Sequence, residues 1–410
     1  MKTVEVNLEH DAFVEKVPHE TFAWLRKEAP VYWYDWKQGK GFWCITRHED
    51  ITQVLKNWRV YSSELGGANL EDLDEEQRKA RQSMLETDPP RHTRLRGLVS
   101  KWFTPKSVAQ YEGLVRQLTR IILDEALQHK EFDFIDKIAA QLPIQVLARI
   151  LGVPPEDTPK LIEWGDKMMG NTDPDVADVL WDSKEAEKYR LYPFRSPAAL
   201  EVFEYGHWLG RKRRNNPQND LVSKLVHAEI DGERLTEREF DTMFLLLVVA
   251  GNETTRQAIA HGMHAFIQYP EQTVRLQGDP SLMPTAVEEI LRWSSPILHF
   301  RRTATTDTTM HGQTIKAGDK VVLWFVSANR DETVFEDPDR FDIGRNPNPH
   351  LAFGQGGPHV CLGSYLARLE IRVMFEELLP HLHKFSLAGK PERMCSNFTN
   401  ALKRMPVRFQ

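Results

Sequence analysis

The sequence predicts a mainly α-helical protein with small β-sheets. Three observations lead to this class: a helical pattern continues from Thr236 to Tyr269, a second helical stretch follows Cys361, and strand-like alternation is confined to short segments near the two ends of the chain. The chain has 410 residues, 41% of them hydrophobic and 27% charged, so it can bury a large core. Because no Ser/Gly-rich or Pro-rich linker and no internal repeat divides it, we expect one domain spanning residues 1–410.

The first strands are expected in VYWYDW and GFWCITRH, at residues 31–36 and 41–48. The clearest helix comes much later and begins at a capping box formed by Thr236 and Glu239. It stops at Pro270, so at 1.5 Å per residue it is about 50 Å long, enough to cross the molecule. Its apolar stretch, residues 243–250, is far shorter than the roughly 20 residues of a membrane span, which predicts a buried central helix.

Two further helices and a late strand region complete the predicted elements. One helix is expected around Thr285–Trp293, because Pro296 ends it. Another is expected after Cys361 and ends before Pro380. The stretch TIKAGDKVVLWFVSA, residues 314–328, again has the alternation of strands.

Charge and cysteine content limit the class of protein. The net charge of −6 argues against general affinity for nucleic acid, and the basic run RKRR at residues 211–214 is expected to be the solvated end of a helix. Cys44, Cys361 and Cys395 are too few and too scattered for a disulfide framework, and the start MKTVEVNLEHD lacks an export signal. We therefore expect a cytoplasmic protein without a membrane anchor.

The motif AGNETT, residues 250–255, places an acid and two threonines in the otherwise apolar long helix. In one interpretation Glu253 faces solvent and Thr254 bonds back to the carbonyl one turn earlier. In the other, Gly251 leaves the helix kinked and bare, so that a small ligand such as dioxygen can approach. The Thr254 hydroxyl would then lie beside that ligand, and Glu253 would resupply protons. The motif by itself leaves both interpretations open.

The loop FGQGGPHVCLG, residues 353–363, holds Cys361 among glycines at the mouth of a helix. As a nucleophile the thiol lacks a well-placed base, since His359 is only two residues away. As a zinc ligand it has only His350 and His359 nearby, without CxxC or HxxxH spacing. A cysteine that is simply buried in the core would not require the glycines of this loop. A helix amino terminus and amide donors favour a thiolate, and a thiolate suits iron.

The sequence resembles the cytochrome P-450 heme-thiolate monooxygenases over nearly its whole length. Four motifs agree with that family in order and spacing: AGNETT, EILR at residues 289–292, PDRF at residues 338–341, and the cysteine loop. The resemblance implies the cytochrome P-450 fold, with heme b between the long central helix and the helix after the cysteine loop. One position departs from the family: the aromatic residue usually found seven positions before the cysteine is replaced by Gly354, and Phe353 lies one further back. Similar lengthened loops occur in bacterial members that oxidise steroid or isoprenoid side chains.

The resemblance implies roles for individual residues. Cys361 would be the axial ligand of the heme iron, where thiolate donation favours cleavage of the O–O bond. Glu289 and Arg292 with Arg340 would form a buried ion network that supports the cysteine loop. Basic side chains would meet the heme propionates. The residues that the resemblance places at the cofactor are Cys361, His92, Arg96, Arg302, His359, Ala250 and Phe353.

The implied reaction inserts one oxygen atom from O2 into a C–H bond of a hydrophobic small molecule, such as a terpenoid, a steroid or a branched or aromatic hydrocarbon. Thr254 would hold the distal oxygen, and Glu253 would relay protons. The expected walls of the substrate chamber are Leu247, Val248, Ile297 and Leu298, and the expected lid segments are Leu65–Glu86 and Gly165–Trp208.

Electrons would come from a separate ferredoxin with its reductase, and ultimately from NAD(P)H, because the sequence has no flavin, nucleotide or iron–sulfur pattern. The basic residues Arg91, Arg94, Lys101 and Arg345 are candidates to receive an acidic ferredoxin, although solvated cations would look the same in a sequence. Two rival functions are a peroxide-driven peroxygenase, which usually alters the acid and alcohol pair, and a heme carrier or sensor, which has no use for a proton relay.

Overall fold

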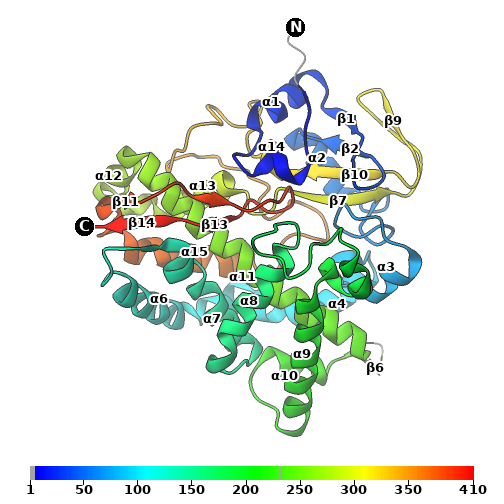
Figure 1. The fold of residues 1–410 in the computed structure, drawn as a ribbon, viewed down its shortest axis with the longest axis horizontal. Coiled ribbons are helices and arrows are strands. Elements are labelled where there is room, and N and C mark those ends of the chain that lie inside the picture. Colours follow the sequence, from blue (N-terminus) through cyan, green and yellow to red (C-terminus); the bar gives the residue numbers. More distant parts are fainter. Residues whose placement is uncertain (1–4, 231) are drawn as a thin grey trace.

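Helices dominate the computed structural model, which describes residues 5–230 and 232–410 (Figure 1). The α-helices are α1 (His19–Glu28), α2 (His48–Lys56), α3 (Glu75–Arg81), α4 (Arg91–Val99), α5 (Pro105–Ala109), α6 (Glu112–Ala126), α7 (Gln141–Leu151), α8 (Thr158–Met169), α9 (Pro197–Asn215), α10 (Leu221–Val226), α11 (Glu237–Gln268), α12 (Pro270–Gly278), α13 (Met283–Ser294), α14 (Phe325–Ala328) and α15 (Ser364–Leu378). The strands are short and lie mainly towards the two ends of the chain. This arrangement confirms the predicted class.

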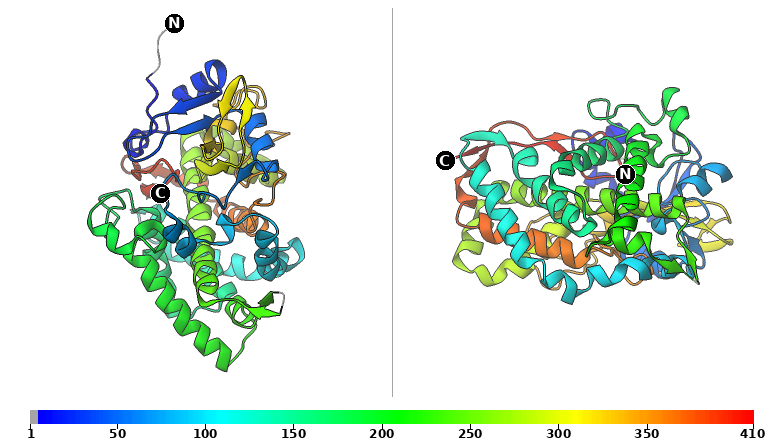
Figure 2. Two further views of the ribbon diagram at one scale, coloured as in Figure 1. Left: turned by 90° about the vertical axis from the view of Figure 1, so that its right-hand side faces the viewer. Right: turned by 90° about the horizontal axis from the view of Figure 1, so that it is seen from below.

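The long predicted helix is α11, and it runs through the middle of the molecule (Figure 2). Its capping box forms as predicted, because Thr236 accepts from the Glu239 amide while the Glu239 carboxylate accepts from the Thr236 amide. The helix packs against α7, α8, α9, α13 and α15. It is helical without a break through residues 250–255.

The main sheet has five strands in the order β1-β2-β10-β7-β3. The strands of this and the four smaller sheets are β1 (Val31–Tyr34), β2 (Phe42–Ile45), β3 (Tyr61–Ser62), β4 (Glu131–Asp133), β5 (Glu229–Ile230), β6 (Glu233–Arg234), β7 (His299–Ala304), β8 (Thr308–Met310), β9 (Gln313–Ile315), β10 (Lys320–Trp324), β11 (Phe385–Leu387), β12 (Glu392–Arg393), β13 (Leu402–Arg404) and β14 (Pro406–Phe409). Strand β10 pairs in parallel with β2 and antiparallel with β7. Strands thus form in each predicted segment, at residues 31–34, 42–45, 313–315 and 320–324.

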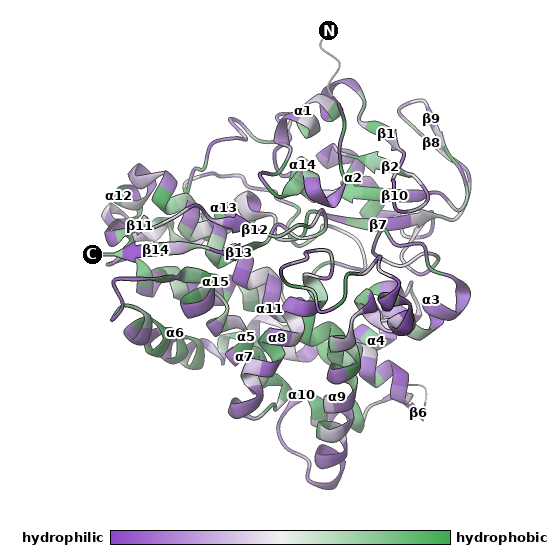
Figure 3. Ribbon diagram, viewed as in Figure 1, coloured by the Kyte–Doolittle hydropathy of each residue, from purple (hydrophilic) through white to green (hydrophobic). Residues whose placement is uncertain are grey.

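The core explains why every residue of β10 after Lys320 is hydrophobic (Figure 3). Val322 and Trp324 pack into an apolar cluster shared with the N-terminal segment, whereas Val321 and Leu323 pack into another cluster on the opposite face of the sheet. Alternate side chains of a strand point to opposite faces, so a strand covered on both faces must be apolar throughout. A third and larger cluster surrounds α11.

Two local predictions are wrong. Residues 325–328, expected to continue the strand, form the short helix α14, in which the buried Phe325 packs in the same cluster as Leu323 after the chain turns. Arg213, expected to be solvated, is buried: it bonds to Asp220 and donates to the Gly152 carbonyl at 2.6 Å. Over the described ranges, none of the helices has both the length and the apolar character needed to cross a membrane.

Candidate active site

The cysteine loop is a tight irregular segment whose glycines have two separate uses. Gly354 and Gly356 have φ values of 69° and 71°, in the left-handed region that glycine tolerates best. Gly357 lies so close to the Leu55 carbonyl that an added Cβ would collide with it. The amide of Cys361 donates to the Phe353 carbonyl at 2.9 Å, which closes the loop just before α15. The backbone of the loop therefore requires Gly354, Gly356 and Gly357.

The ionisation expected for Cys361 needs a correction. We expected the helix terminus and amide donors to favour the thiolate. Burial instead raises the pKa of Cys361, and the Gly363 amide and the Arg96 and Arg368 guanidinium groups only partly oppose it. The protein alone therefore favours the neutral thiol. A thiolate at this position needs a further positive charge, such as a metal ion.

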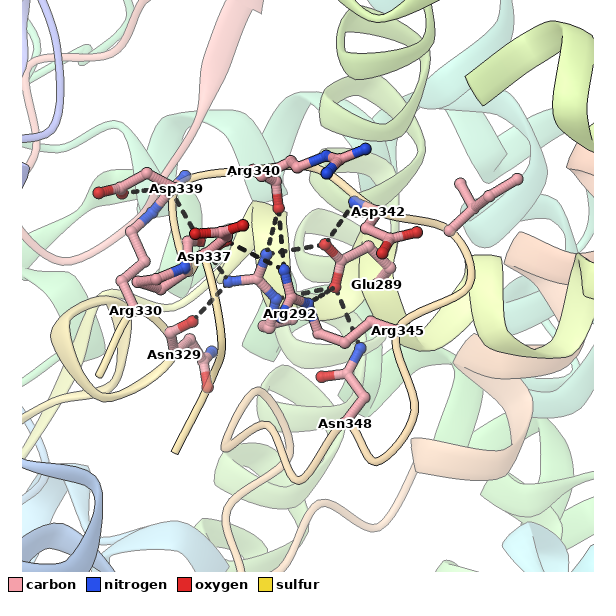
Figure 4. Close-up of polar contacts among 12 residues, drawn as sticks. Glu289, Arg292, Asn329, Arg330, Asp337, Asp339, Arg340, Asp342, Arg345 and Asn348 are labelled. Atoms are coloured by element: carbon pink, nitrogen blue, oxygen red, sulfur yellow. Dashed lines mark hydrogen bonds and ion pairs between the residues drawn. The ribbon is translucent and has the colours of Figure 1, made fainter. Parts of the chain in front are cut away.

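A buried ion network supports the loop from outside the cavity (Figure 4). Arg292 makes a two-pronged contact with Glu289, at 2.8 and 2.7 Å, and also donates to the carbonyls of Asn329, Pro338 and Arg340. The expected third member, Arg340, offers only its backbone oxygen, because its guanidinium points away (Figure 4). Arg345 takes that place and donates to Glu289 at 3.2 Å.

One large cavity lies between the cysteine loop and α11. The predicted site residues that line it are Cys361, His92, Arg96, Arg302, His359, Ala250, Phe353 and Thr254. Thus eight of the nine residues, drawn from four separate parts of the sequence, meet in one space. Only Glu253 of the predicted set does not face it.

The basic side chains at the cysteine end of the cavity lack anionic partners. Arg302 is 3% exposed and its Nη1 donates to the Arg301 carbonyl at 2.8 Å, while burial lowers its pKa to about 10. Both ring nitrogens of His359 are buried without a hydrogen-bond partner among the described residues. The His92 and His359 rings lie 4.0 Å apart between centroids. The ring nitrogens of His92, by contrast, already contact the Met84 and Pro358 carbonyls at 2.9 and 3.0 Å. The Arg302 guanidinium and the His359 imidazole, left in this state, fit a ligand with carboxylates, as the propionates of heme would provide.

Thr254 lies at the cavity wall, and both earlier interpretations of it hold in part. Its hydroxyl donates to the Ala250 carbonyl at 3.1 Å, as a mid-helix threonine commonly does. The side chain nevertheless lines the cavity together with Ala250 and Gly251. A Cβ added at Gly251 would come within 3.2 Å of Leu147, so this glycine also allows close packing of α7.

Glu253 points away from the cavity into a buried polar cluster between α8 and α11. Its carboxylate accepts from Gln257 at 2.7 Å and lies 3.3 Å from Nη1 of Arg256. The same Nη1 bonds to Asp166, and the Asp166 side chain is 31% exposed whereas that of Glu253 is 2% exposed. Asp166 also lines a second cavity, formed between α6, α7 and α8. The cluster therefore connects the partly exposed Asp166 with Glu253, the residue that precedes Thr254.

Sequence reasoning missed Asp166 and Arg256. Arg256 stands three residues after Glu253, a spacing that favours an ion pair on a helix, so its part could have been anticipated. Nothing in the sequence pairs Asp166 with a residue 90 positions away. Burial raises the pKa of Asp166 to about 6, and the neighbouring Glu253 adds to this effect while Arg256 opposes it.

Some of the residues predicted to form the walls and the lid of the substrate chamber line the cavity. Leu247 and Ile297 line the cavity as predicted. The prediction is wrong for Val248 and Leu298, which pack into apolar clusters instead, because the side chains of neighbouring residues point in different directions. Both lid segments contribute lining residues, among them Leu70, Met84, Met169, Trp181 and Phe194. Glu71 joins the two segments through contacts of 2.6 Å to Arg81 and to Arg195.

The candidate docking cations differ in their availability. Arg345 is committed to Glu289, and its side chain is only 9% exposed, so its assignment to a docking surface was wrong. Arg91 is exposed and pairs with Glu239 at 3.1 Å. Arg94 and Lys101 are also exposed. All three therefore lie at the surface of the molecule.

Comparisons with known proteins agree over the whole chain. A family model described as Cytochrome P450 matches residues 6–408. A methyl-branched lipid omega-hydroxylase of Mycobacterium tuberculosis is 41% identical over 411 residues, covering 98% of this chain and 93% of the relative. A steroid C26-monooxygenase of Mycolicibacterium smegmatis is 37% identical, covering 97% and 91% of the two chains. A solved Mycobacterium marinum cytochrome P450 in complex with pseudoionone superposes with a TM-score of 0.89 at 37% identity, covering 100% of this chain and 99% of that one.

Proposed function

The chain belongs to the cytochrome P450 family, and from this premise we propose that it is a heme b-dependent hydroxylase of terpenoid, steroid or methyl-branched hydrocarbon chains that receives its electrons from a ferredoxin. The family and its named monooxygenase relatives make the chain a monooxygenase that acts on hydrophobic substrates. The observation that carries the proposal is the one cavity in which Cys361, the basic side chains of His92, Arg96, Arg302 and His359, and Thr254 meet. We further propose that residues 1–410 form one domain, which the packing of five helices around α11 supports.

The cofactor would be held at both its centre and its edge. The sulfur of Cys361 would bind the iron, and the positive charge of the metal would offset the burial that otherwise keeps the thiol neutral. Arg302, Arg96, His92 and His359 would bind the two propionates. When bound, the heme supplies the activation of dioxygen and the transfer of one oxygen atom. The protein supplies orientation, protons and the exclusion of water.

Protons would enter from the α8 side of α11. Asp166 reaches solvent and shares Nη1 of Arg256 with Glu253, so the two carboxylates are close enough for a water molecule to bridge them. A proton would pass from Asp166 to Oε2 of Glu253, which has no hydrogen-bond partner among the described residues. Glu253 would then turn towards the cavity and deliver the proton beside the Thr254 hydroxyl. Arg256 would hold both acids and stay protonated.

Electrons would be received on the cysteine side of the molecule. Arg91 and Arg94 on α4 and the nearby Lys101 are exposed and project from the segment that also carries His92 and Arg96. An acidic ferredoxin would be attracted there by charge complementarity, and the electron path to Cys361 would be short. NAD(P)H would be the ultimate donor, through a ferredoxin reductase.

Thr254→Ala is expected to uncouple the reaction. The variant should still bind substrate and consume NADH, but most of the electrons should appear as hydrogen peroxide because the hydroxyl that positions the incoming proton is gone. The ratio of hydroxylated product to NADH is the measurement, with Thr254→Ser as the control that retains the hydroxyl. An alanine variant that couples as well as the wild type would remove Thr254 from the proposed relay.

Asp166→Asn is expected to lower product per NADH by roughly 10-fold, a part of the 10²–10⁴-fold that direct proton transfer contributes. Because burial raises the pKa of Asp166 to about 6, its proton-carrying form is present below that pH and is lost above it. The difference in product per NADH between the wild type and Asp166→Asn should therefore shrink as the pH rises from about 6 to about 8. Glu163→Gln is the matched control, since Glu163 lies on the same helix but pairs with Lys167 at 2.7 Å. Equal pH profiles for wild type and Asp166→Asn would contradict the route.

Reconstitution tests the function as a whole. The heme-loaded protein is supplied with a surrogate ferredoxin, its reductase, NADH and a panel of terpenoids, steroids and methyl-branched hydrocarbons. We expect hydroxylated product that depends on NADH and ferredoxin. Product formed with hydrogen peroxide alone would favour a peroxygenase, and tight ligand binding without turnover would favour a carrier or sensor.

A further inference from the structure

Asn252, on α11, is a buried polar side chain that none of the contacts described above involves. It is 0% exposed, and neither its Oδ1 nor its Nδ2 has a hydrogen-bond partner among the described residues. A primary amide offers two N–H donors and one acceptor oxygen. Because buried groups of this kind are nearly always bonded to protein or to an ordered water molecule, Asn252 indicates a polar ligand in the interior of the protein.

The Asn252 side chain faces α8 at Gly165. Helix α8 packs on α11, and a Cβ added at Gly165 would lie 3.3 Å from Nδ2 of Asn252. Apart from the chain neighbours of Gly165 and the local backbone of α8, no other atom of the described residues lies within 4 Å of that Cβ position. Gly165 is itself buried. The glycine therefore leaves room for a small molecule beside the amide, inside the protein.

Two further buried atoms without a hydrogen-bond partner among the described residues belong to the same part of α11. They are Nε of Arg256 and Oε2 of Glu253. Arg256 follows Asn252 by one helical turn, and side chains at this spacing lie on one face with their Cβ atoms about 5–6 Å apart. The Arg256 guanidinium bonds to Asp166, which follows Gly165 on α8. Both side chains thus point towards the same stretch of α8.

The donors and acceptors of this group match one water molecule. Nε of Arg256 and Nδ2 of Asn252 can donate, whereas Oδ1 of Asn252 and Oε2 of Glu253 can accept. A water molecule accepts two hydrogen bonds and donates two. Two atoms that share a water molecule lie up to about 6 Å apart, since each bond is about 2.9 Å long, and the helical spacing satisfies this limit.

Charge disfavours an ion at this position. An anion would meet the carboxylates of Glu253 and Asp166, and a cation would meet the guanidinium of Arg256, whose Nη1 lies between those two acids. A buried ion needs an uncommitted partner of opposite charge, whereas water needs only hydrogen bonds. Water is therefore the ligand that these atoms select.

We propose that Asn252, together with Nε of Arg256, binds an ordered water molecule between α8 and α11, and that this water carries protons from Asp166 to Glu253. The inference rests on the proposed function and specifies the proton route of that site. The protonated carboxyl of Asp166 would replace one N–H donor and give its proton to the water, which would pass one of its own protons to the carboxylate of Glu253. Asp166 then ends as the carboxylate, Glu253 as the neutral acid, and the water is unchanged. Asn252 is a positioning residue, because it fixes the water and exchanges no proton.

Coupling of NADH to product tests this role in the heme-loaded protein supplied with ferredoxin and reductase. Asn252→Leu, similar in size but apolar, should lower product per NADH by about 5- to 10-fold, no more than Asp166→Asn does. Because both changes act on one route, the double variant should couple no worse than the poorer single variant. Asn252→Ser, which keeps a hydroxyl, should recover part of the coupling. Wild-type coupling in Asn252→Leu, or losses that multiply in the double variant, would overturn the proposal.

Gly165→Ala separates the water from the stability of the helix. The added methyl group fills the space beside Asn252, so product per NADH should fall as in Asn252→Leu. The variant should nevertheless unfold at the same or a higher urea concentration than the wild type, because alanine favours a helix more than glycine does. Gly113→Ala is the control, since a Cβ added at this position of α6 meets nothing within 4 Å, and it should keep wild-type coupling. Equal coupling in the two alanine variants would contradict the proposal.

A high-resolution crystal structure of the wild type decides without turnover, even where a variant does not fold. We expect an ordered water molecule within hydrogen-bond distance of Asn252 and of Glu253 or Arg256, and none there in Asn252→Leu. A dry site in a wild type that hydroxylates its substrate would overturn the water site and leave the proposed function standing. A wild type that forms no product from any compound would refute the proposed function, and the electron density beside Asn252 would still decide the water site.

Discussion

Arg292→Ala is expected to destabilise the protein by about 3–5 kcal/mol, because it leaves the carboxylate of Glu289 buried without its main partner. The side chains of both residues are 0% exposed, so water cannot replace the lost contacts. Three backbone carbonyls of the segment that leads to the cysteine loop would lose a donor at the same time. Since whole domains are stable by only about 5–15 kcal/mol, most of the variant should fail to fold or to retain heme.

Urea unfolding followed by circular dichroism measures this effect, together with the heme content after purification. Arg340→Ala is the matched control, because its guanidinium points away from the network and only its backbone carbonyl takes part. That control should unfold at nearly the wild-type urea concentration. A loss of less than about 1 kcal/mol in Arg292→Ala would show that the network is not needed for stability.

Cys361→His is expected to abolish hydroxylation. An imidazole nitrogen can bind the iron, so the variant should retain part of its heme, but it cannot supply the electron density by which a thiolate favours cleavage of the O–O bond. Product formation with saturating ferredoxin, reductase and NADH is the measurement. Cys395→Ser is the control, because Cys395 does not line the cavity.

A Cys361→His variant that hydroxylates at the wild-type rate would exclude the thiolate as the functional ligand. If Cys395→Ser lost as much activity as Cys361→His, the effect of replacing a cysteine would not be specific to the loop. The pair of variants therefore separates a change of ligand from a general loss of structure.

Much of the fold could be predicted from the sequence because its signals are local. The capping box of Thr236 and Glu239 fixes where α11 begins, and Pro270 fixes where it ends, so both bounds were confirmed. Strand β10 was recognisable because its residues after Lys320 are all apolar, as expected of a strand buried on both faces. The short helix α14 was missed, because four buried residues directly after a strand have the composition of its continuation.

The contents of the cavity were predicted through the family motifs, and the errors arose where the motif does not fix a direction. The spacing of Glu289 and Arg292 places both on one face of a helix, and they pair as expected. The PDRF motif identifies Arg340 but not which of its atoms is used, and Arg345 supplies the guanidinium instead. Val248 was placed in the cavity, although it faces the core.

The polar contacts between distant segments could not be predicted. Asp166 meets Arg256 only after α8 has packed on α11, and no local pattern connects them. The same is true of Trp36, His299 and Asn397, which line one cavity from the connection between β1 and β2, from β7 and from the C-terminal segment. Such juxtapositions depend on tertiary packing, which a single sequence does not encode in any short stretch.

The central claim is that the sulfur of Cys361 binds the iron of a heme in the cavity below Thr254. The carbon monoxide difference spectrum of the reduced, heme-loaded wild-type protein tests it most directly, because the position of the Soret band reports the ligand opposite carbon monoxide and needs no knowledge of the substrate. We predict the long-wavelength band typical of a thiolate. A band at the shorter wavelength typical of a nitrogen ligand in the fully folded protein, or no heme after growth with a porphyrin precursor, would contradict the claim.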